Sequence, residues 1–413
     1  MKKRWFSLAL VLAVCLGAAA PASAYNAVLP GGYVPVSYGR SCAAAIDADG
    51  SLWAAGQYGW NAECVFEASK LMDDVRSVSC GMYFAAAVKT DGSLWMWGDN
   101  ENGQVGNGRG WDARDEQGYI MQTVPVKVMD DVDSVSCGVR HAAALKKDGS
   151  LWTWGWNDYG KGTLGINRSG NWEDREMGFT CQTVPAKIMD GVTAVSCGGN
   201  FTAIVKADGS LWMCGSNFYG ELGIGTSSAS GDYDRSSPVK VMDGVKAVCC
   251  GDSFTAAIKT DGSLWTWGRN QYGQLGNGCE GNEKGWRDEP YQTLPVKVLD
   301  GVKAVSCGDT GGAAVKDDGS LWIWGESGSL GLDTGAEKTA AVALGEQLVD
   351  VKLHAVPVKV LDGVVAAACG RKGAVSAVKA DGSLVNLGHF YVPVPEGLTV
   401  LLPKDGESKP AQP

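Results

Sequence analysis

The chain has 413 residues, with 36 Lys and Arg against 46 Asp and Glu, and a net charge of −10. Nucleic-acid affinity depends on neutralising phosphates, so an acidic chain argues against a nucleic-acid partner. The 58 glycines and the scarcity of helix-length periodic segments favour an all-β protein of many short strands and turns.

The N-terminal residues 1–24 resemble a signal peptide. They combine basic residues at 2–4, an apolar run at 8–20 and the sequence Ala-Ser-Ala at 22–24. A membrane anchor is one alternative, but the run is short for a span and no second one follows. A lipoprotein signal at Cys15 is another, although Val14 is larger than such processing prefers. We expect an exported, secreted or cell-surface monomer that begins at residue 25 and has no stable membrane insertion.

Asp-Gly followed by Ser-Leu recurs seven times after this segment. The pairs begin at Asp49, Asp91, Asp148, Asp208, Asp261, Asp318 and Asp381. The spacing between successive Asp-Gly pairs is typical of propeller blades or solenoid coils. Residues 25–403 are therefore expected to form one repeat domain, and the polar residues 404–413 a disordered tail.

Each repeat predicts four strands, which we describe for the copy centred on Asp261. They are residues 238–241, 245–250, 254–259 and 263–267. Asp-Gly between alternating runs is a strong hairpin signal, because both residues tolerate the positive φ of tight hairpin turns. The repeated Asp-Gly pairs are accordingly predicted to be turns.

Residue size separates these strands into inner and outer ones. The two strands before each Asp-Gly carry small residues, whereas the strand after it carries tryptophans two apart, as at Trp265 and Trp267. Radially packed sheets are close at the axis and splay outward, so small residues suit the centre and indoles the periphery. We therefore predict a seven-bladed β-propeller of four-stranded antiparallel blades. Residues 27–39 can be aligned with the repeat so that Gly39 occupies the position of the repeated glycine. Residues 397–403 are a candidate outer strand, and either terminus could complete the seventh blade.

The segments WGDNENGQVGNG at 97–108 and WGRNQYGQLGNG at 267–278 carry a family resemblance. Over about residues 27–403 the sequence resembles the regulator of chromosome condensation repeat, a family of seven-bladed propellers. Blade 1 lacks the Gln-Leu-Gly element, blade 6 shortens it and blade 7 loses both tryptophans. The family includes a chromatin-bound exchange factor for a nuclear GTPase and secreted bacterial propellers that inhibit β-lactamases. For an exported chain, the resemblance implies that one propeller face clamps a partner protein.

No motif for catalysis, a cofactor or a metal stands out. His141 occupies a slot that other repeats fill with Phe, so we interpret it as a packing residue, and His354 and His389 have no evident carboxylate or nucleophile partner. The G-x-G-x-x-G match at 276–281 precedes no helix. Residues 47–51 faintly resemble a calcium loop but lack its terminal Glu, and a hairpin turn fits them better. We expect no catalytic residue, cofactor or metal site.

Six cysteines occupy a repeated Cys-Gly slot, one per blade from the second to the seventh. Such spacing keeps them apart around a ring, so we predict small buried hydrophobic residues and no disulfide framework. Among the others, Cys42 and Cys64 are a candidate disulfide in blade 1.

Two sets of loops vary between repeats and should emerge on the same face. The turns after Cys-Gly place Arg40, Tyr83, Arg140, Asn200, Ser253, Thr310 and Lys372 around the channel mouth. The long loops after Trp-Gly carry Trp111 with Arg114, Trp172 with Arg175, and Trp286 with Arg287.

Trp and Arg on a rigid ring of loops are typical of binding hot spots, although the tryptophans could equally fold back and staple their own loops. We predict a non-catalytic module that binds an extracellular protein or glycan. The alternatives are a polysaccharide-acting enzyme with paired carboxylates in the acidic loops, or a cell-envelope scaffold.

Overall fold

The computed structural model describes most of the repeat domain. The described residues are 9–11, 36–39, 42–47, 49–57, 65–110, 120–157, 162–167, 170–174, 179–228, 231, 234–278, 281–284, 289–326, 338–344, 347–370, 374–380, 383–387 and 399–401. Among them, no helix has the length and hydropathy that a membrane span requires.

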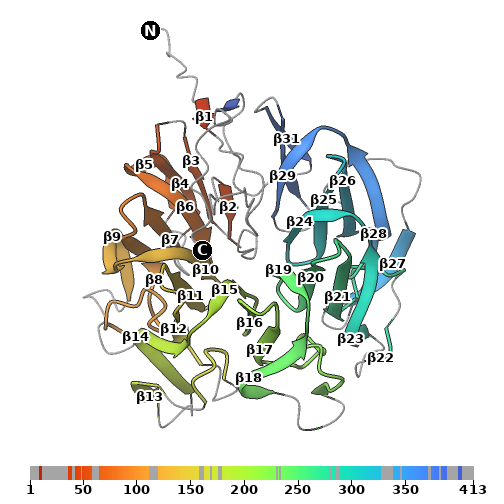
Figure 1. The fold of residues 1–413 in the computed structure, drawn as a ribbon, viewed down its shortest axis with the longest axis horizontal. Helices are drawn as coiled ribbons and strands as arrows, with labels where there is room; N and C mark the ends of the chain where they lie inside the picture. Colours follow the sequence, from red (N-terminus) through yellow and green to blue (C-terminus); the bar gives the residue numbers. More distant parts are fainter. Residues whose placement is uncertain are drawn as a thin grey trace.

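Seven antiparallel sheets surround a central axis as the blades of a propeller, which confirms the predicted fold (Figure 1). Blade 1 contains β2 (Val36–Tyr38), β3 (Cys42–Ile46), β4 (Leu52–Gln57) and β5 (Val65–Met72). Blade 2 contains β6 (Val75–Cys80), β7 (Phe84–Lys89), β8 (Leu94–Asp99) and β9 (Met121–Met129). Blade 3 contains β10 (Val132–Cys137), β11 (His141–Lys146), β12 (Leu151–Trp156), β14 (Phe179–Met189) and a short fifth strand, β13 (Trp172–Asp174).

The remaining blades repeat this order. Blade 4 contains β15 (Val192–Cys197), β16 (Phe201–Lys206), β17 (Leu211–Gly215) and β18 (Arg235–Met242). Blade 5 contains β19 (Val245–Cys250), β20 (Phe254–Lys259), β21 (Leu264–Arg269), β23 (Pro290–Leu299) and β22 (Glu283–Lys284). Blade 6 contains β24 (Val302–Cys307), β25 (Gly311–Lys316), β26 (Leu321–Glu326), β28 (Gln347–Leu361) and β27 (Lys338–Leu344). The described strands of blade 7 are β29 (Val364–Cys369), β30 (Val375–Lys379) and β31 (Leu384–Leu387).

The six described Asp-Gly pairs are turns, as predicted, and each lies between the second and third strands of its blade. In blade 5, Asp261 Oδ1 accepts hydrogen bonds from the Ser263 amide at 2.9 Å and from the Ser263 hydroxyl. That hydroxyl in turn accepts the indole N–H of Trp265 at 2.9 Å, while Gly262 takes a φ of 81°. Asp, Gly, Ser and Trp thus act as one turn unit, which explains why they recur together.

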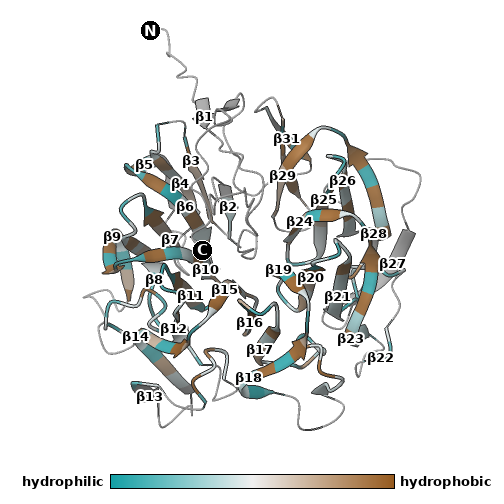
Figure 2. Cartoon of the chain, viewed as in Figure 1, coloured by the Kyte–Doolittle hydropathy of each residue, from teal (hydrophilic) through white to brown (hydrophobic). Residues whose placement is uncertain are grey.

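The Pro-Val-Lys-Val segment corrects the predicted strand order. The order within a blade, as in β6-β7-β8-β9, puts the Trp-bearing strand third and Pro-Val-Lys-Val fourth. The segment therefore closes the blade before the one in which we placed it, and the indoles do not occupy the outermost strand. Outer strands β23 and β28 alternate between hydrophilic and hydrophobic residues, as half-exposed strands do (Figure 2).

The second tryptophan of each pair joins neighbouring blades. The indole N–H of Trp154 donates to the Gln104 carbonyl of the preceding blade at 2.9 Å, and that of Trp324 to the Gln274 carbonyl at 2.8 Å. Trp154 is fully buried among residues of blades 2 and 3. The indoles of Trp154 and Trp324 supply both apolar area and a satisfied polar contact at the interface between blades.

A ring of serines joins the innermost strands. The Ser136 hydroxyl accepts the Cys197 amide of the next blade at 2.9 Å. Equivalent bonds run from Cys80 to Ser37, from Cys137 to Ser79, from Cys250 to Ser196 and from Cys369 to Ser306. At the blade 5–6 junction Cys249 Sγ takes this role and accepts the Cys307 amide at 3.2 Å.

The ring closes between blades 7 and 1. Tyr38 in β2 bonds through its hydroxyl to the Ser376 hydroxyl of β30 at 3.0 Å, across 338 residues of sequence. Gly39 occupies the position of the repeated glycine, because its amide donates to the Cys42 carbonyl just as the Gly81 amide donates to the Phe84 carbonyl. Residues 36–38 therefore form the inner strand of blade 1.

The outer-strand prediction for residues 397–403 is wrong within the described part of the chain. β32 (Thr399–Leu401) pairs in parallel with β1 (Ala9–Val11), and not with β31. The other residues of the predicted signal segment and the tail at 404–413 lie outside the described residues.

The cysteines in the repeated slot are small buried residues, as predicted. All ten described cysteines are free and buried. Burial raises the pKa of the Cys197 thiol to about 12, so it stays protonated. Cys42 is a free thiol, so the predicted disulfide between Cys42 and Cys64 is wrong. Cys64 itself lies outside the described residues.

Candidate functional site

The turns after Cys-Gly and the loops after Trp-Gly share one face, as predicted. In blade 2 the amide of Asp99, the residue after Trp-Gly, donates to the Tyr83 carbonyl in the turn at 2.9 Å. The same bond joins Trp156 to Arg140, Ser216 to Asn200, Arg269 to Ser253 and Glu326 to Thr310, at 2.8–3.0 Å. We call this surface the loop face.

The structure describes part of the predicted binding set. Tyr83, Arg140 and Asn200 lie in loop-face turns, as do Ser253 and Thr310. Trp172 opens β13, whose backbone pairs with β14 at Cys181. The others lie outside the described residues and stay a prediction: Arg40, Trp111, Arg114, Arg175, Trp286, Arg287 and Lys372.

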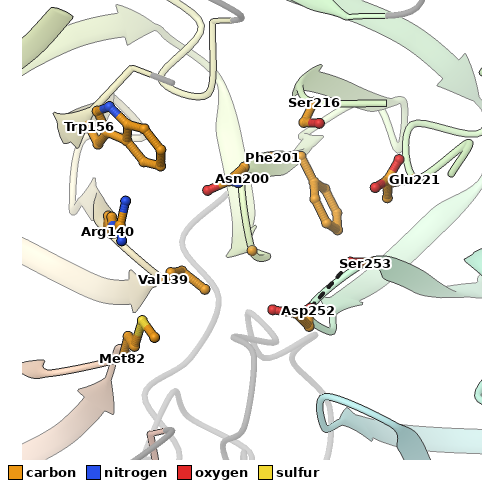
Figure 3. A pocket seen from close by; sticks show the side chains of 11 residues that line it. Met82, Val139, Arg140, Trp156, Asn200, Phe201, Ser216, Glu221, Asp252 and Ser253 are labelled. Carbon is orange, nitrogen blue, oxygen red and sulfur yellow. Dashed lines mark hydrogen bonds between the residues drawn. The ribbon is translucent and has the colours of Figure 1, made fainter. Parts of the chain in front are cut away.

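A pocket of about 330 Å³ opens on the loop face over blade 4. Arg140 and Trp156 of blade 3 stand on one side, and Glu221 and Asp252 on the other (Figure 3). Its remaining lining comes from Met82, Val139, Gly199, Asn200, Phe201, Ser216 and Ser253. Arg140, Asn200 and Ser253, three of the residues predicted around the channel mouth, are brought together here, whereas Tyr83 does not line the pocket.

Two small residues of blade 4 create the hollow. Gly199 stands where the neighbouring turns carry Val139 and Asp252, and its amide donates to the Asp252 carbonyl at 3.0 Å. A Cβ at Gly199 would collide with that carbonyl oxygen, so this close approach requires glycine. Ser216 similarly stands where blade 3 carries Trp156. Blade 4 therefore lacks the bulk that covers the same place in its neighbours.

One side of the pocket is an arginine stacked on an indole. The Arg140 guanidinium carbon lies 4.7 Å from the centroid of the Trp156 ring, within cation–π range. Trp156 is half-buried, and its amide bonds to the Arg140 carbonyl at 2.9 Å. Backbone and side chain together hold the guanidinium beside the pocket.

The other side contains a buried carboxyl group. Glu221 is only 4% exposed, and its Oε2 accepts the Tyr219 amide at 2.8 Å. Burial is the main cause that raises the pKa of Glu221 from 4.5 to about 8; the negative charges of Asp234 and Asp252 act in the same direction, and backbone hydrogen bonds to the carboxylate act against it. The group is therefore mostly protonated at neutral pH.

Histidine does not contribute a base to this site. His141 packs under its turn, and its Nε2 lies 3.1 Å from the Thr202 hydroxyl. Burial lowers the pKa of His141 to about 3, so the ring is neutral. This confirms the packing interpretation.

The calcium-like segment is a hairpin turn in the structure. Asp47 Oδ1 accepts the amides of Asp49 and Ser51, and its Oδ2 accepts the Trp53 indole N–H at 2.8 Å. Among the described residues, no three His, Cys, Asp or Glu side chains are grouped so that they could hold a metal ion.

Sequence reasoning missed Glu221, Trp156, Ser216 and Asp252. A usable signal was present for Glu221, because it interrupts a slot that holds Gln104 in blade 2 and Gln274 in blade 5.

The family model described as RCC1-like domain matches residues 33–376. The chain is 30% identical over 226 residues to the RCC1 domain-containing protein RUG3, mitochondrial, of Arabidopsis thaliana, covering 53% of this chain and 48% of that protein. It is 28% identical over 272 residues to the ultraviolet-B receptor UVR8 of the same plant, covering 64% and 56%. The matched region thus spans about half the length of these relatives.

A solved structure shares the fold. It is that of Prp20p from Saccharomyces cerevisiae, described together with its binding properties to Gsp1p and histones. The TM-score is 0.61 at 19% identity, over 85% of this chain and 83% of that one.

Proposed function

The chain belongs to the RCC1-like domain family, and on that premise we propose that it is a non-catalytic module that binds a partner protein through its loop face. The observation that carries the proposal is the pocket over blade 4. It places Arg140, an indole and two carboxyl groups on loops held by a rigid propeller. Such a combination of Arg, aromatic and charged groups on scaffolded loops is typical of binding hot spots.

Two further observations support this reading. Prp20p, which shares the fold, is described for its binding to proteins. Residues 1–24 have the features of a signal peptide, so we propose that the protein meets its partner after export, in the medium or at the cell surface. A glycan ligand would use the same Trp and Arg side chains, so a glycan array should accompany the search for a protein.

A charge reversal on each face tests the proposal. Arg140→Glu reverses a charge on the loop face, and Lys147→Glu makes the same change in the Asp-Gly turn on the opposite face of the same blade. Each protein would be crosslinked to culture supernatant and intact cells, and captured partners identified by mass spectrometry. We expect Arg140→Glu alone to lose a partner captured by the unsubstituted protein. Equal capture by both variants would contradict use of the loop face.

A polysaccharide-acting enzyme is the second candidate. It is favoured because Glu221, a protonated carboxyl, and Asp252 line the same pocket, and glycoside hydrolysis uses such pairs. Hydrolysis of a polysaccharide panel that is abolished by Glu221→Gln would support it. Absence of hydrolysis would leave binding as the function.

A further inference from the structure

Glu221 replaces a glutamine without any change in its backbone setting. Its carbonyl accepts the Trp267 indole N–H at 2.7 Å and the Thr255 hydroxyl at 2.9 Å. Gln274 of blade 5 has the same indole bond, and its Oε1 accepts the Tyr272 amide at 2.8 Å as Glu221 accepts that of Tyr219. Only the chemistry of the outermost side-chain atom differs between these slots.

That atom is a donor in glutamine and an acceptor in ionised glutamate. In blade 2, Gln104 Nε2 donates to Asp99 Oδ2 at 3.0 Å. In blade 4 the residue equivalent to Asp99 is Ser216, and no Lys or Arg of the described chain forms an ion pair with Glu221. The change from Gln to Glu therefore creates a site that an N–H donor from outside the chain can fill.

The pocket gives such a donor access. Gly199 and Ser216 leave the hollow described above, and its volume of about 330 Å³ is at the lower end of the range for ligand pockets. Asp252 adds a second carboxylate on the same side as Glu221, while Arg140 stands opposite (Figure 3). The acidic side can therefore attract one cationic group, and Arg140 disfavours its placement elsewhere in the pocket.

We propose that this pocket receives a basic side chain of the partner protein, whose ammonium or guanidinium group pairs with Glu221 at the base and Asp252 at the rim. The proposal rests on the proposed function of the loop face and names the chemistry that one of its subsites recognises. A charge-assisted hydrogen bond in a desolvated pocket is the kind of contact that dominates binding energy.

Binding of a cation should release a proton. Burial, with the charges of Asp234 and Asp252, holds the pKa of Glu221 near 8 in the empty pocket, and Arg140 stands on the opposite side. A bound cation favours the ionised form, so affinity should rise as pH rises through about 8. From the fraction of Glu221 ionised at each pH, we expect about 30-fold tighter binding at about pH 9 than at about pH 6.5.

The test uses ethylguanidinium as the probe and N-ethylurea as its neutral counterpart, titrated calorimetrically into the full chain at matched ionic strength. Buffers of different ionisation enthalpy would report the released proton. Glu221→Gln restores the residue of the equivalent slots and should fold, and Glu101→Gln in the blade 2 loop is a matched control. We expect Glu221→Gln to weaken ethylguanidinium binding at least tenfold at about pH 9 and to abolish the pH dependence, with Glu101→Gln unchanged.

Three results would overturn the proposal: no saturable binding of ethylguanidinium, equal binding of N-ethylurea, or equal binding of ethylguanidinium by Glu221→Gln. If one of them occurred while Arg140→Glu still lost its partner, the loop face would stand and the basic side chain would not. If Arg140→Glu and Lys147→Glu captured the same partners while the probe bound as expected, the proposed function would fall and the cation site would remain.

Discussion

Replacing Glu221 by Gln should stabilise the protein at neutral pH and not at acidic pH. The carboxyl has a pKa near 8 in the folded chain against 4.5 as its ordinary value, because burial disfavours its charge. The folded state therefore holds more protons than the unfolded state between these values, and stability falls as pH rises from about 4.5 to about 8. Glutamine carries no such dependence.

The magnitude follows from the difference in pKa. Each unit corresponds to about 1.4 kcal/mol, so at pH 7 the carboxyl costs about 3 kcal/mol relative to a neutral group. Spread over a domain of this size, that free energy raises Tm by about 4 °C. At about pH 4.5 both side chains are largely neutral, and the two proteins should melt within about 1 °C of each other.

Thermal unfolding followed by tryptophan fluorescence at both pH values measures the effect, with Glu101→Gln as the control. The mirror variant Gln104→Glu should destabilise at neutral pH, because it sets a carboxylate against Asp99, which accepts from Gln104 at 3.0 Å. A gain for Glu221→Gln that is equal at both pH values, or no gain at pH 7, would refute the assignment of a buried protonated carboxyl.

Three other predictions concern the scaffold, each measured by Tm or urea unfolding. Ser136→Ala leaves the buried Cys197 amide without its acceptor and should cost about 1–3 kcal/mol, whereas Cys249→Ser restores the residue of the other junctions and should cost less than 1 kcal/mol. Trp154→Phe keeps most of the apolar area but loses the indole N–H bond to the neighbouring blade, and should cost about 1–2 kcal/mol; an effect no larger than that of Trp95→Phe would contradict an inter-blade role. Hydrogen bonds from Ser263 lower the pKa of Asp261, so the folding stability that ionised Asp261 contributes is present at neutral pH and is lost as pH falls through that lowered pKa. Asp261→Asn should therefore flatten the decrease of Tm at acidic pH.

The candidate site was only partly accessible from sequence. Comparing repeats located the loop face and three pocket residues, Arg140, Asn200 and Ser253, because variable loops between invariant strands are visible in a single chain. It could also have flagged Glu221, which differs from glutamine at one slot. It could not show that Gly199 and Ser216 open a hollow beside that carboxyl, because the hollow is lined by residues from four blades.

By itself the sequence determined the number of blades, their Asp-Gly turns and the repeated glycine at Gly39, because hairpin turns and strand periodicity depend on residues close together in the chain. The tertiary structure decided which blade each Pro-Val-Lys-Val strand completes, how the propeller closes between Tyr38 and Ser376, and which residues surround Glu221. These features depend on contacts between residues far apart in sequence. Strand pairing, burial and the resulting shift of a carboxyl pKa exist only once the blades are packed around a common axis.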